Sequence, residues 1–270
     1  MGFGAIIIGD EIMRGKRADK HFAKLIELLA LRGLHLDWSA YLGDDRRRLT
    51  ETLALSLKTE DVVFCFGGIG VTPDDHTRQA AAAAAGVPLS LHPEAEAEIR
   101  ARFAQTGTEV THDRLQLGEF PVGSRIIPNP FNRIPGFSFA DHHFFPGFPQ
   151  MAHPMLEWVL DSYYRERFHQ MPEAEQAIIV WEGNEGTLLG LMRRIEATHA
   201  GLSVFSLPSF GSAAKGRHIE LGVRGDPAQV PAAMREIGAE VSRLGFQWEE
   251  LKPRPEPGFD EPKHEPKREP

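Results

Sequence analysis

Two short, continuous apolar runs constrain the fold of this chain most strongly. Residues 5–8 lead into Gly9 and Asp10, and residues 62–66 lead into Gly67 and Gly68. Strands that are apolar at every position are buried on both faces, which is typical of the interior of a parallel sheet. Because each run passes into glycine and then into a helical pattern, the sequence predicts strand–helix units.

Three such units follow one another in the first 86 residues. A helix that Asp19 can cap ends near Gly33, a strand covers residues 36–42, and a helix with leucines at 49, 53 and 57 comes next. The third strand enters a glycine loop, and the alanine-rich helix after that loop ends at Gly86. The order predicts an α/β fold with a mostly parallel sheet and helices on both of its faces.

The rest of the chain divides near residues 170–172. Before this boundary we expect helices over residues 94–103 and 154–168, with short strands at 125–127 and 143–145. After it, a strand–helix–strand–strand–helix order over residues 174–250 predicts a small α+β domain with its helices on one face of a sheet. Residues 251–270 are rich in proline and charge, and we expect a disordered tail there. The predicted domains are therefore residues 1–170 and 174–250.

Composition narrows the class of partner. The formal charge of −8 disfavours DNA or RNA, which need a basic face. The single cysteine, Cys65, excludes an intramolecular disulfide and fits a reducing cytoplasm, and no apolar run approaches the ~20 residues of a membrane span. We expect a cytoplasmic protein whose partner is a small molecule, with no membrane contact.

The glycine loop of residues 67–77 has the chemistry of a phosphate site. Glycine lets backbone N–H groups approach an anion closely, and the N-terminus of the following helix adds partial positive charge. Two common glycine signatures do not match: Val71 stands where a Walker loop has lysine, and Pro73 replaces the third glycine of the dinucleotide pattern. The alternative is a tight turn with Asp74 or Asp75 as a helix cap.

Acidic pairs follow all three strands. If the strands are parallel, the side chains of these pairs meet at the edge that carries the glycine loop. There they would hold a divalent metal such as Mg²⁺ that bridges to phosphates, or bind ligand hydroxyl and amino groups. Helix capping is the competing explanation for each pair. The pairs are Asp10 with Glu11, Asp44 with Asp45, and Asp74 with Asp75.

The order and spacing of these motifs resemble the molybdopterin-binding domain of molybdopterin adenylyltransferases and of the competence/damage-inducible protein A (CinA) family. The matching motifs are Gly9-Asp10-Glu11-Ile12 with Gly15 and Asp19, Leu42-Gly43-Asp44-Asp45, and Gly67-Gly68-Ile69-Gly70 with Thr72, Asp75 and Thr77. Later Pro-Gly turns are similar to the CinA branch, where they close the site: Asn129-Pro130, Pro135-Gly136-Phe137 and Phe145-Pro146-Gly147-Phe148-Pro149.

The resemblance implies a three-layer α/β fold, a molybdopterin or nucleotide ligand and self-association into an oligomer. The positions that match Asp75 and Asp44 are associated with catalysis in the adenylyltransferases. The remaining matched positions imply phosphate cradling or ligand binding: Gly67, Gly68, Gly70, Thr72, Thr77, Asp10, Glu11, Asp19, Pro146 and Gly147. The amidohydrolase domain that ends full-length CinA proteins has no counterpart in these motifs.

Three functions stay open on this sequence: adenylyl transfer to molybdopterin, pyrophosphate hydrolysis of a dinucleotide such as ADP-ribose or FAD, and binding without catalysis. The third is favoured by three departures from the family pattern, namely Val71, His76 and His21, and the bulky Arg14 is a further departure. We expect Cys65 to be a buried core residue. Histidines 142, 143 and 153 lack the spacing of metal ligands, and His76 is either a solvated helix residue or a proton donor.

Overall fold

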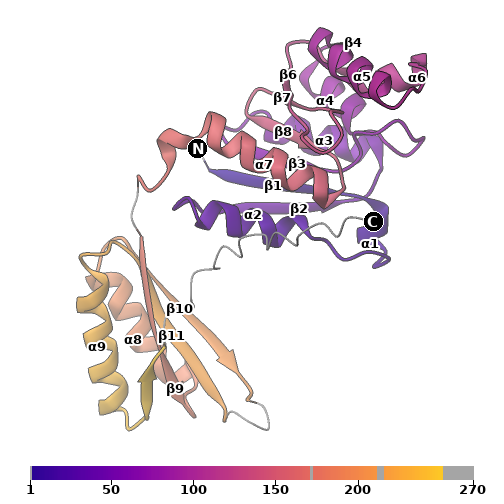
Figure 1. Ribbon diagram of the computed structural model, residues 1–270. Coiled ribbons are helices and arrows are strands. Elements are labelled where there is room, and N and C mark those ends of the chain that lie inside the picture. Colours follow the sequence, from indigo (N-terminus) through magenta and orange to yellow (C-terminus); the bar gives the residue numbers. More distant parts are fainter. Residues whose placement is uncertain (1, 171–172, 212–215, 252–270) are drawn as a thin grey trace, which may run out of the picture. The chain divides into compact units, whose positions relative to one another are not determined.

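The computed structural model describes residues 2–170, 173–211 and 216–251. The chain divides into two compact units, Met1–Gln170 and Met171–Pro270, which Figure 1 shows in sequence colours. The tail expected from residue 251 onward lies outside the described residues, apart from Leu251.

The described residues of the first unit form a six-stranded mixed sheet. Its strands lie in the order β2-β1-β3-β8-β7-β6. The first four of these strands are mutually parallel, and β8-β7-β6 continue the sheet as an antiparallel meander. The bounds are β1 Phe3–Ile8, β2 Trp38–Leu42, β3 Val62–Phe66, β6 Arg125–Ile127, β7 Gly136–Phe139 and β8 His142–Phe145. The predicted α/β fold with a mostly parallel sheet is confirmed.

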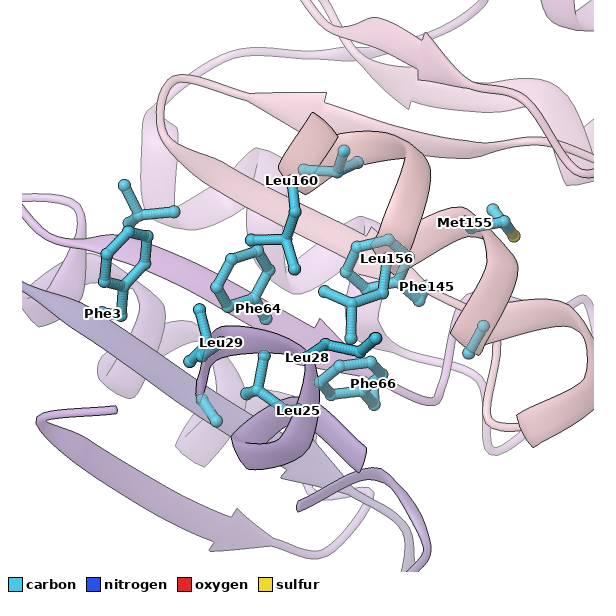
Figure 2. Packing of buried hydrophobic residues seen from close by; sticks show 14 of the residues in the cluster. Phe3, Leu25, Leu28, Leu29, Phe64, Phe66, Phe145, Met155, Leu156 and Leu160 are labelled. Atoms are coloured by element: carbon cyan, nitrogen blue, oxygen red, sulfur yellow. The ribbon is translucent and has the colours of Figure 1, made fainter. Parts of the chain in front are cut away.

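Alternation along the central strands gives the sheet two buried faces. On one face, Phe3 and Phe64 pack against α2 (His21–Ala30) and α7 (Pro149–Tyr163), as Figure 2 shows. On the other face, Ile6 and Cys65 pack in a core that includes leucines of α3 (Arg46–Ser56) and alanines of α4 (Thr77–Ala85). Helices on both faces make the three layers, and each face buries apolar side chains that favour folding.

Local signals explain most helix bounds. The carboxylate of Asp19 accepts hydrogen bonds from the backbone N–H groups of His21 and Phe22 at 2.8 and 3.1 Å, so it caps α2 as expected. Gly86 ends α4 in the left-handed conformation, with φ of 69°. The expected helix over 154–168 is shifted: α7 begins at Pro149, where proline suits the first turn, and it keeps Pro154 inside the helix.

Shorter elements complete the first unit. Helix α1 (Asp10–Met13) follows β1 directly, while β4 (Leu89–Leu91) and β5 (Glu119–Pro121) form a separate antiparallel pair. Between β4 and β5 lie α5 (Pro93–Gln105), α6 (His112–Leu115) and a 3₁₀ turn over Gln116–Gly118. A second 3₁₀ turn over Arg165–Arg167 follows α7. The sequence patterns missed the β4–β5 pair, because each of its strands has only three residues.

The second unit is an antiparallel sheet with two helices. Its strand order is β10-β11-β9-β12, and residues of the sheet and of both helices share one buried cluster. The element order matches the expected α+β pattern, with β12 added. The bounds are β9 Ala174–Trp181, α8 Glu185–Thr198, β10 Leu202–Ser209, β11 His218–Gly225, α9 Val230–Arg243 and β12 Trp248–Glu250. Across the described residues, no helix combines the length and the apolar character that crossing a membrane requires.

Candidate phosphate-ligand site

The glycine loop turns sharply at the carboxyl end of β3. Gly67 and Gly68 have φ angles of 106° and 67°, which side chains with a Cβ rarely adopt. The Gly67 N–H donates to the carbonyl of Phe145 at 2.9 Å, so the loop is joined to the turn after β8. A Cβ on Gly68 would lie 2.3 Å from Oγ1 of Thr77. Only glycine therefore fits this path of the backbone without rearrangement.

Thr77 holds the loop together from within. Its hydroxyl donates to the carbonyl of Gly67 at 3.0 Å, and its backbone N–H donates to the carbonyl of Gly68 at 3.0 Å. The side chain is fully buried. In this arrangement Thr77 supports the glycine loop from beneath, whereas the family resemblance implied a place among the phosphate-cradling residues.

Asp75 fixes the second half of the loop. One carboxylate oxygen, Oδ2, accepts from the backbone N–H of Thr72 at 2.8 Å and from its hydroxyl at 2.5 Å. The same oxygen would lie 2.4 Å from a Cβ on Gly70. His76 occupies the cap position of α4 without a side-chain hydrogen bond, so neither acid of this pair caps the helix through its side chain. The helix-cap explanation for Asp75 is wrong.

A buried arginine joins the loop to a distant segment. The guanidinium of Arg78 donates to the carbonyl of Gly70 at 2.7 Å, to that of Glu119 at 3.2 Å, and to that of Gln116. Its side chain is 2% exposed, and burial lowers its pKa while Glu119 and Asp75 act in the opposite direction. The three hydrogen bonds that the guanidinium donates offset part of the cost of burying this cation.

The acids after β1 and β2 hold each other in place. The N–H of Asp10 donates to Oδ2 of Asp44 at 2.8 Å, and the N–H of Asp44 donates to Oδ1 of Asp10 at 3.3 Å. Arg14 forms an ion pair with Asp10 at 2.6 Å. Burial raises the pKa of Asp44, the charges of Asp10, Glu11 and Asp74 raise it further, and the hydrogen bond from Asp10 opposes them. Asp45, by contrast, caps α3 by accepting from Arg48.

A cavity of about 690 Å³ gathers most of these residues. Among the residues expected from sequence, nine line it: Glu11, Asp44, Gly67, Gly68, Gly70, Thr72, Asp75, Pro146 and Gly147. The other three lie elsewhere. Asp10 supports Asp44, Thr77 is buried beneath the loop, and Asp19 caps α2 and accepts from the hydroxyl of Tyr41 at 2.8 Å. The convergence of strand ends and glycine loop at one sheet edge is therefore observed.

Two further groups of residues line the cavity, and of these only Asn129 had been named from the sequence, as part of the Asn129-Pro130 turn. Lys16 and Arg17 line the cavity from the segment after α1, which has no periodic pattern to mark it. Asn129 and Asn132 line it from the loop before β7, where their carboxamides hold the backbone near Ile134. The Asn-Pro and Pro-Gly turns in the sequence could have pointed to the two asparagines. No sequence pattern pointed to the two cations.

The remaining candidates lie away from the cavity. Cys65 is buried in the sheet, and burial raises the pKa of its thiol. The rings of the neighbouring histidines 142 and 143 bond different partners: His142 bonds Ser56 at 2.8 Å, while His143 bonds Ser138 and Tyr164 at 2.8 and 2.6 Å. His76 does not line the cavity.

The fold and this edge define a class: an α/β domain with a glycine loop and acidic residues at the carboxyl ends of parallel strands. The family model described as a probable molybdopterin binding domain matches residues 4–166. The chain belongs to this family.

Individual relatives agree with this assignment. A CinA-like protein of Anaeromyxobacter sp. (strain Fw109-5) is 29% identical over 266 residues, covering 90% of this chain and 64% of the relative. A putative competence-damage inducible protein of Thermoanaerobacter sp. (strain X514) is 30% identical over 169 residues, covering 61% of this chain and 41% of the relative. The matched part therefore spans less than two thirds of either relative.

A solved structure shares the fold of the first unit. The protein CinA of Thermoplasma acidophilum, described as having unknown function, superposes with a TM-score of 0.53 at 25% identity. The match covers 59% of this chain and 96% of that chain.

Proposed function

We propose that the first unit binds a molybdopterin- or nucleotide-like phosphate ligand in the cavity above the glycine loop, in molybdenum cofactor metabolism. One observation carries the proposal. The backbone N–H groups of residues 68–71 donate to no acceptor among the described residues, and all four residues line the cavity. Successive backbone N–H groups in a glycine loop suit the oxygens of a phosphate, and here they lie in the loop that precedes α4.

The charges around the cavity support a phosphate with a polar or planar extension. Lys16 and Arg17 supply positive charge on the wall of the cavity, which contains the glycine loop. Phe148 lines the same cavity with 55% of its surface exposed, so an aromatic face is available to stack on a planar ring. The family is a probable molybdopterin binding domain, which agrees with a pterin in this place.

A divalent cation fits part of this site. The carboxylates of Glu11, Asp44 and Asp74 line the cavity, and the charges of Glu11 and Asp74 add to the burial that raises the pKa of Asp44. Within the described residues, no group of three or more His, Cys, Asp or Glu side chains is arranged to hold a metal. Mg²⁺ is commonly held by one or two carboxylates together with substrate phosphates. Asp44 and Glu11 would hold it with the ligand, and the metal would neutralise phosphate charge.

The second candidate function is hydrolysis of a dinucleotide pyrophosphate such as ADP-ribose or FAD. The position of Asp44 favours it, since this half-buried carboxylate with a raised pKa lines the same cavity as the phosphate loop. Asp75 uses Oδ2 to hold Thr72, which leaves Oδ1 without a hydrogen-bond partner among the described residues. Asp44 and Asp75 are the residues to which we assign catalysis, with Asp75 also shaping the loop.

Calorimetry and native mass spectrometry test the proposal. Ligand that co-purifies with the protein is identified by mass, and the affinities of molybdopterin, ADP-ribose and ADP are measured with and without Mg²⁺. Asp75→Ala should weaken binding at least about tenfold, since Thr72 loses both of its bonds. Asp141→Ala is the matched control, because Asp141 is exposed at the other end of β8. Full turnover by Asp75→Ala would overturn its catalytic role, and binding without turnover in the unaltered protein would favour a non-catalytic module.

A further inference from the structure

A second pocket of about 630 Å³ adjoins the ligand cavity. The two share Glu11, Arg17, Gly147 and Phe148 in their walls. The second pocket continues along the start of α2 and of α7, where His21 and His153 line it. A ligand seated on the glycine loop would therefore lie next to a compartment with its own polar groups.

His21 presents a buried hydrogen-bond acceptor. Its side chain is 4% exposed and stacks on Phe66 with 4.7 Å between ring centroids. Nε2 lies 3.2 Å from the carbonyl of Gly147, so this nitrogen carries the proton and donates. Burial lowers the pKa of the ring, which keeps it neutral. Nδ1 is then an acceptor, and it is buried without a partner among the described residues.

His153 repeats this pattern from α7. Its ring meets that of His21 edge to face, with 5.4 Å between centroids. Burial lowers its pKa to about 4, with a smaller opposing effect from a hydrogen bond to the backbone of Lys20. Nε2 is buried without a partner among the same described residues, so the proton is on the other nitrogen, which faces that backbone acceptor. Two neutral imidazoles thus each leave one acceptor unsatisfied.

The unsatisfied acceptor nitrogens of His21 and His153 indicate which kind of ligand group suits this pocket. Unsatisfied acceptors need donors, and the carboxylates of Glu11 and Asp19 in the same pocket add further acceptors. Arg17 and Lys20 also line the pocket and can donate, but a phosphate has no donor for the two imidazole nitrogens, whereas a hydroxyl group both donates and accepts. A resident metal would need more ligands than two imidazoles, and the described residues offer no cluster of three. Hydroxyl groups satisfy the pocket best.

We propose that this second pocket binds a hydroxyl-bearing group, such as a sugar, attached beyond the phosphate of the ligand, with His21 Nδ1 and His153 Nε2 accepting its hydrogen bonds. This inference rests on the proposed function, because the phosphate on the glycine loop positions the ligand. The site would then have two parts: the glycine loop binds the phosphate, and the two histidines bind the group attached beyond it.

Calorimetry with ADP-ribose and ADP tests the proposal, because ADP-ribose carries a second ribose beyond its pyrophosphate. The unaltered protein should bind ADP-ribose more tightly than ADP. His153→Phe should weaken ADP-ribose binding about tenfold and leave ADP binding unchanged, whereas His21→Phe, which keeps a ring against Phe66 but loses the bond to Gly147, should weaken ADP-ribose binding more than ADP binding. His35→Phe is the control, since this exposed histidine pairs with Asp37 at the opposite end of β1. In ¹⁵N-histidine spectra, ADP-ribose should shift the Nδ1 resonance of His21, and ADP should not.

The outcomes separate the two proposals. If neither nucleotide binds, the proposed function is overturned and the inference falls with it. If both bind but the histidine variants weaken them equally, or if ADP-ribose has no advantage, the second compartment is overturned alone. Stoichiometric Zn²⁺ binding that both variants abolish would identify a metal site and likewise overturn it.

Discussion

The backbone N–H of Asp10 points at the carboxylate of Asp44 at 2.8 Å, while the backbone N–H of Asp44 points back at Asp10. This reciprocal pair joins the ends of two neighbouring parallel strands, and Asp44 of the pair lines the cavity at the glycine loop. It keeps two like charges close together, and burial of Asp44 adds to the cost of ionising it.

Neutralising Asp44 should stabilise the protein while it impairs the site. A carboxyl whose pKa is raised by folding contributes stability below its unfolded pKa and loses that contribution as pH rises through its folded pKa. Asp44→Asn keeps an oxygen for the Asp10 N–H and removes the charge. The melting temperature should rise by about 1–3 °C at pH 7, after allowance for solvent screening, and should not rise at pH 3. Scanning calorimetry measures this, with Asp45→Asn as a control that retains the α3 cap. A lower melting temperature at pH 7 would contradict the expectation.

Gly68→Ala should destabilise the protein more than Gly86→Ala. The two glycines have nearly equal φ angles, 67° and 69°, so the backbone strain of the two substitutions is similar. Only at Gly68 does the new Cβ meet Thr77, whereas nothing lies within 4 Å at Gly86. We expect a loss of about 1 kcal/mol for Gly86→Ala and about 2–4 kcal/mol for Gly68→Ala in urea unfolding. Equal losses would show that the loop can move away from Thr77.

Acid should unfold the first unit partly through its buried histidines. Burial lowers the pKa of His142 to about 4 and that of His143 to about 3, from an ordinary value of 6.5. The unfolded chain then binds more protons between pH 6.5 and 4, so stability falls as pH falls, by about 1.4 kcal/mol per pH unit for each histidine. Unfolding measured across this range should show a shallower slope in His142→Gln. His35→Gln, an exposed position, serves as the comparison, and an unchanged slope in His142→Gln would refute the assignment.

Arg78→Met should weaken both stability and ligand binding. Methionine fills much of the space, but it leaves the carbonyls of Gly70, Gln116 and Glu119 without their donor. We expect a loss of about 3 kcal/mol and a fall in ligand affinity of at least about tenfold, because Gly70 belongs to the phosphate loop. Arg47→Met removes an exposed pair with Glu51 and should change stability by less than about 1 kcal/mol. Chemical denaturation and calorimetry on both variants check this.

Local patterns were sufficient for the strand–helix units, since β1 and β3 are apolar throughout and Gly86 ends its helix as expected. They could not place β8 beside β3, because that parallel pairing joins segments far apart in the chain. At the site, the places of the glycine loop and of Asp44 could be predicted, because each comes directly after a predicted parallel strand. The buried role of Thr77 did not, since a threonine beneath a loop and one facing a ligand have the same spacing. Lys16 and Arg17 could not be predicted either, because the irregular segment after α1 that brings them to the cavity wall has no periodic pattern.

The parallel ladder between β3 and β8 ends with Phe66 opposite Phe145, and the Gly67 N–H continues it by one more bond. The glycine loop and the Pro146-Gly147 turn are thus anchored to the same rigid edge before any ligand arrives. Binding there needs little ordering of the chain, so less of the interaction energy is lost to entropy. If the ligand binds as proposed, two turns held by one ladder would favour ligands that match their shape.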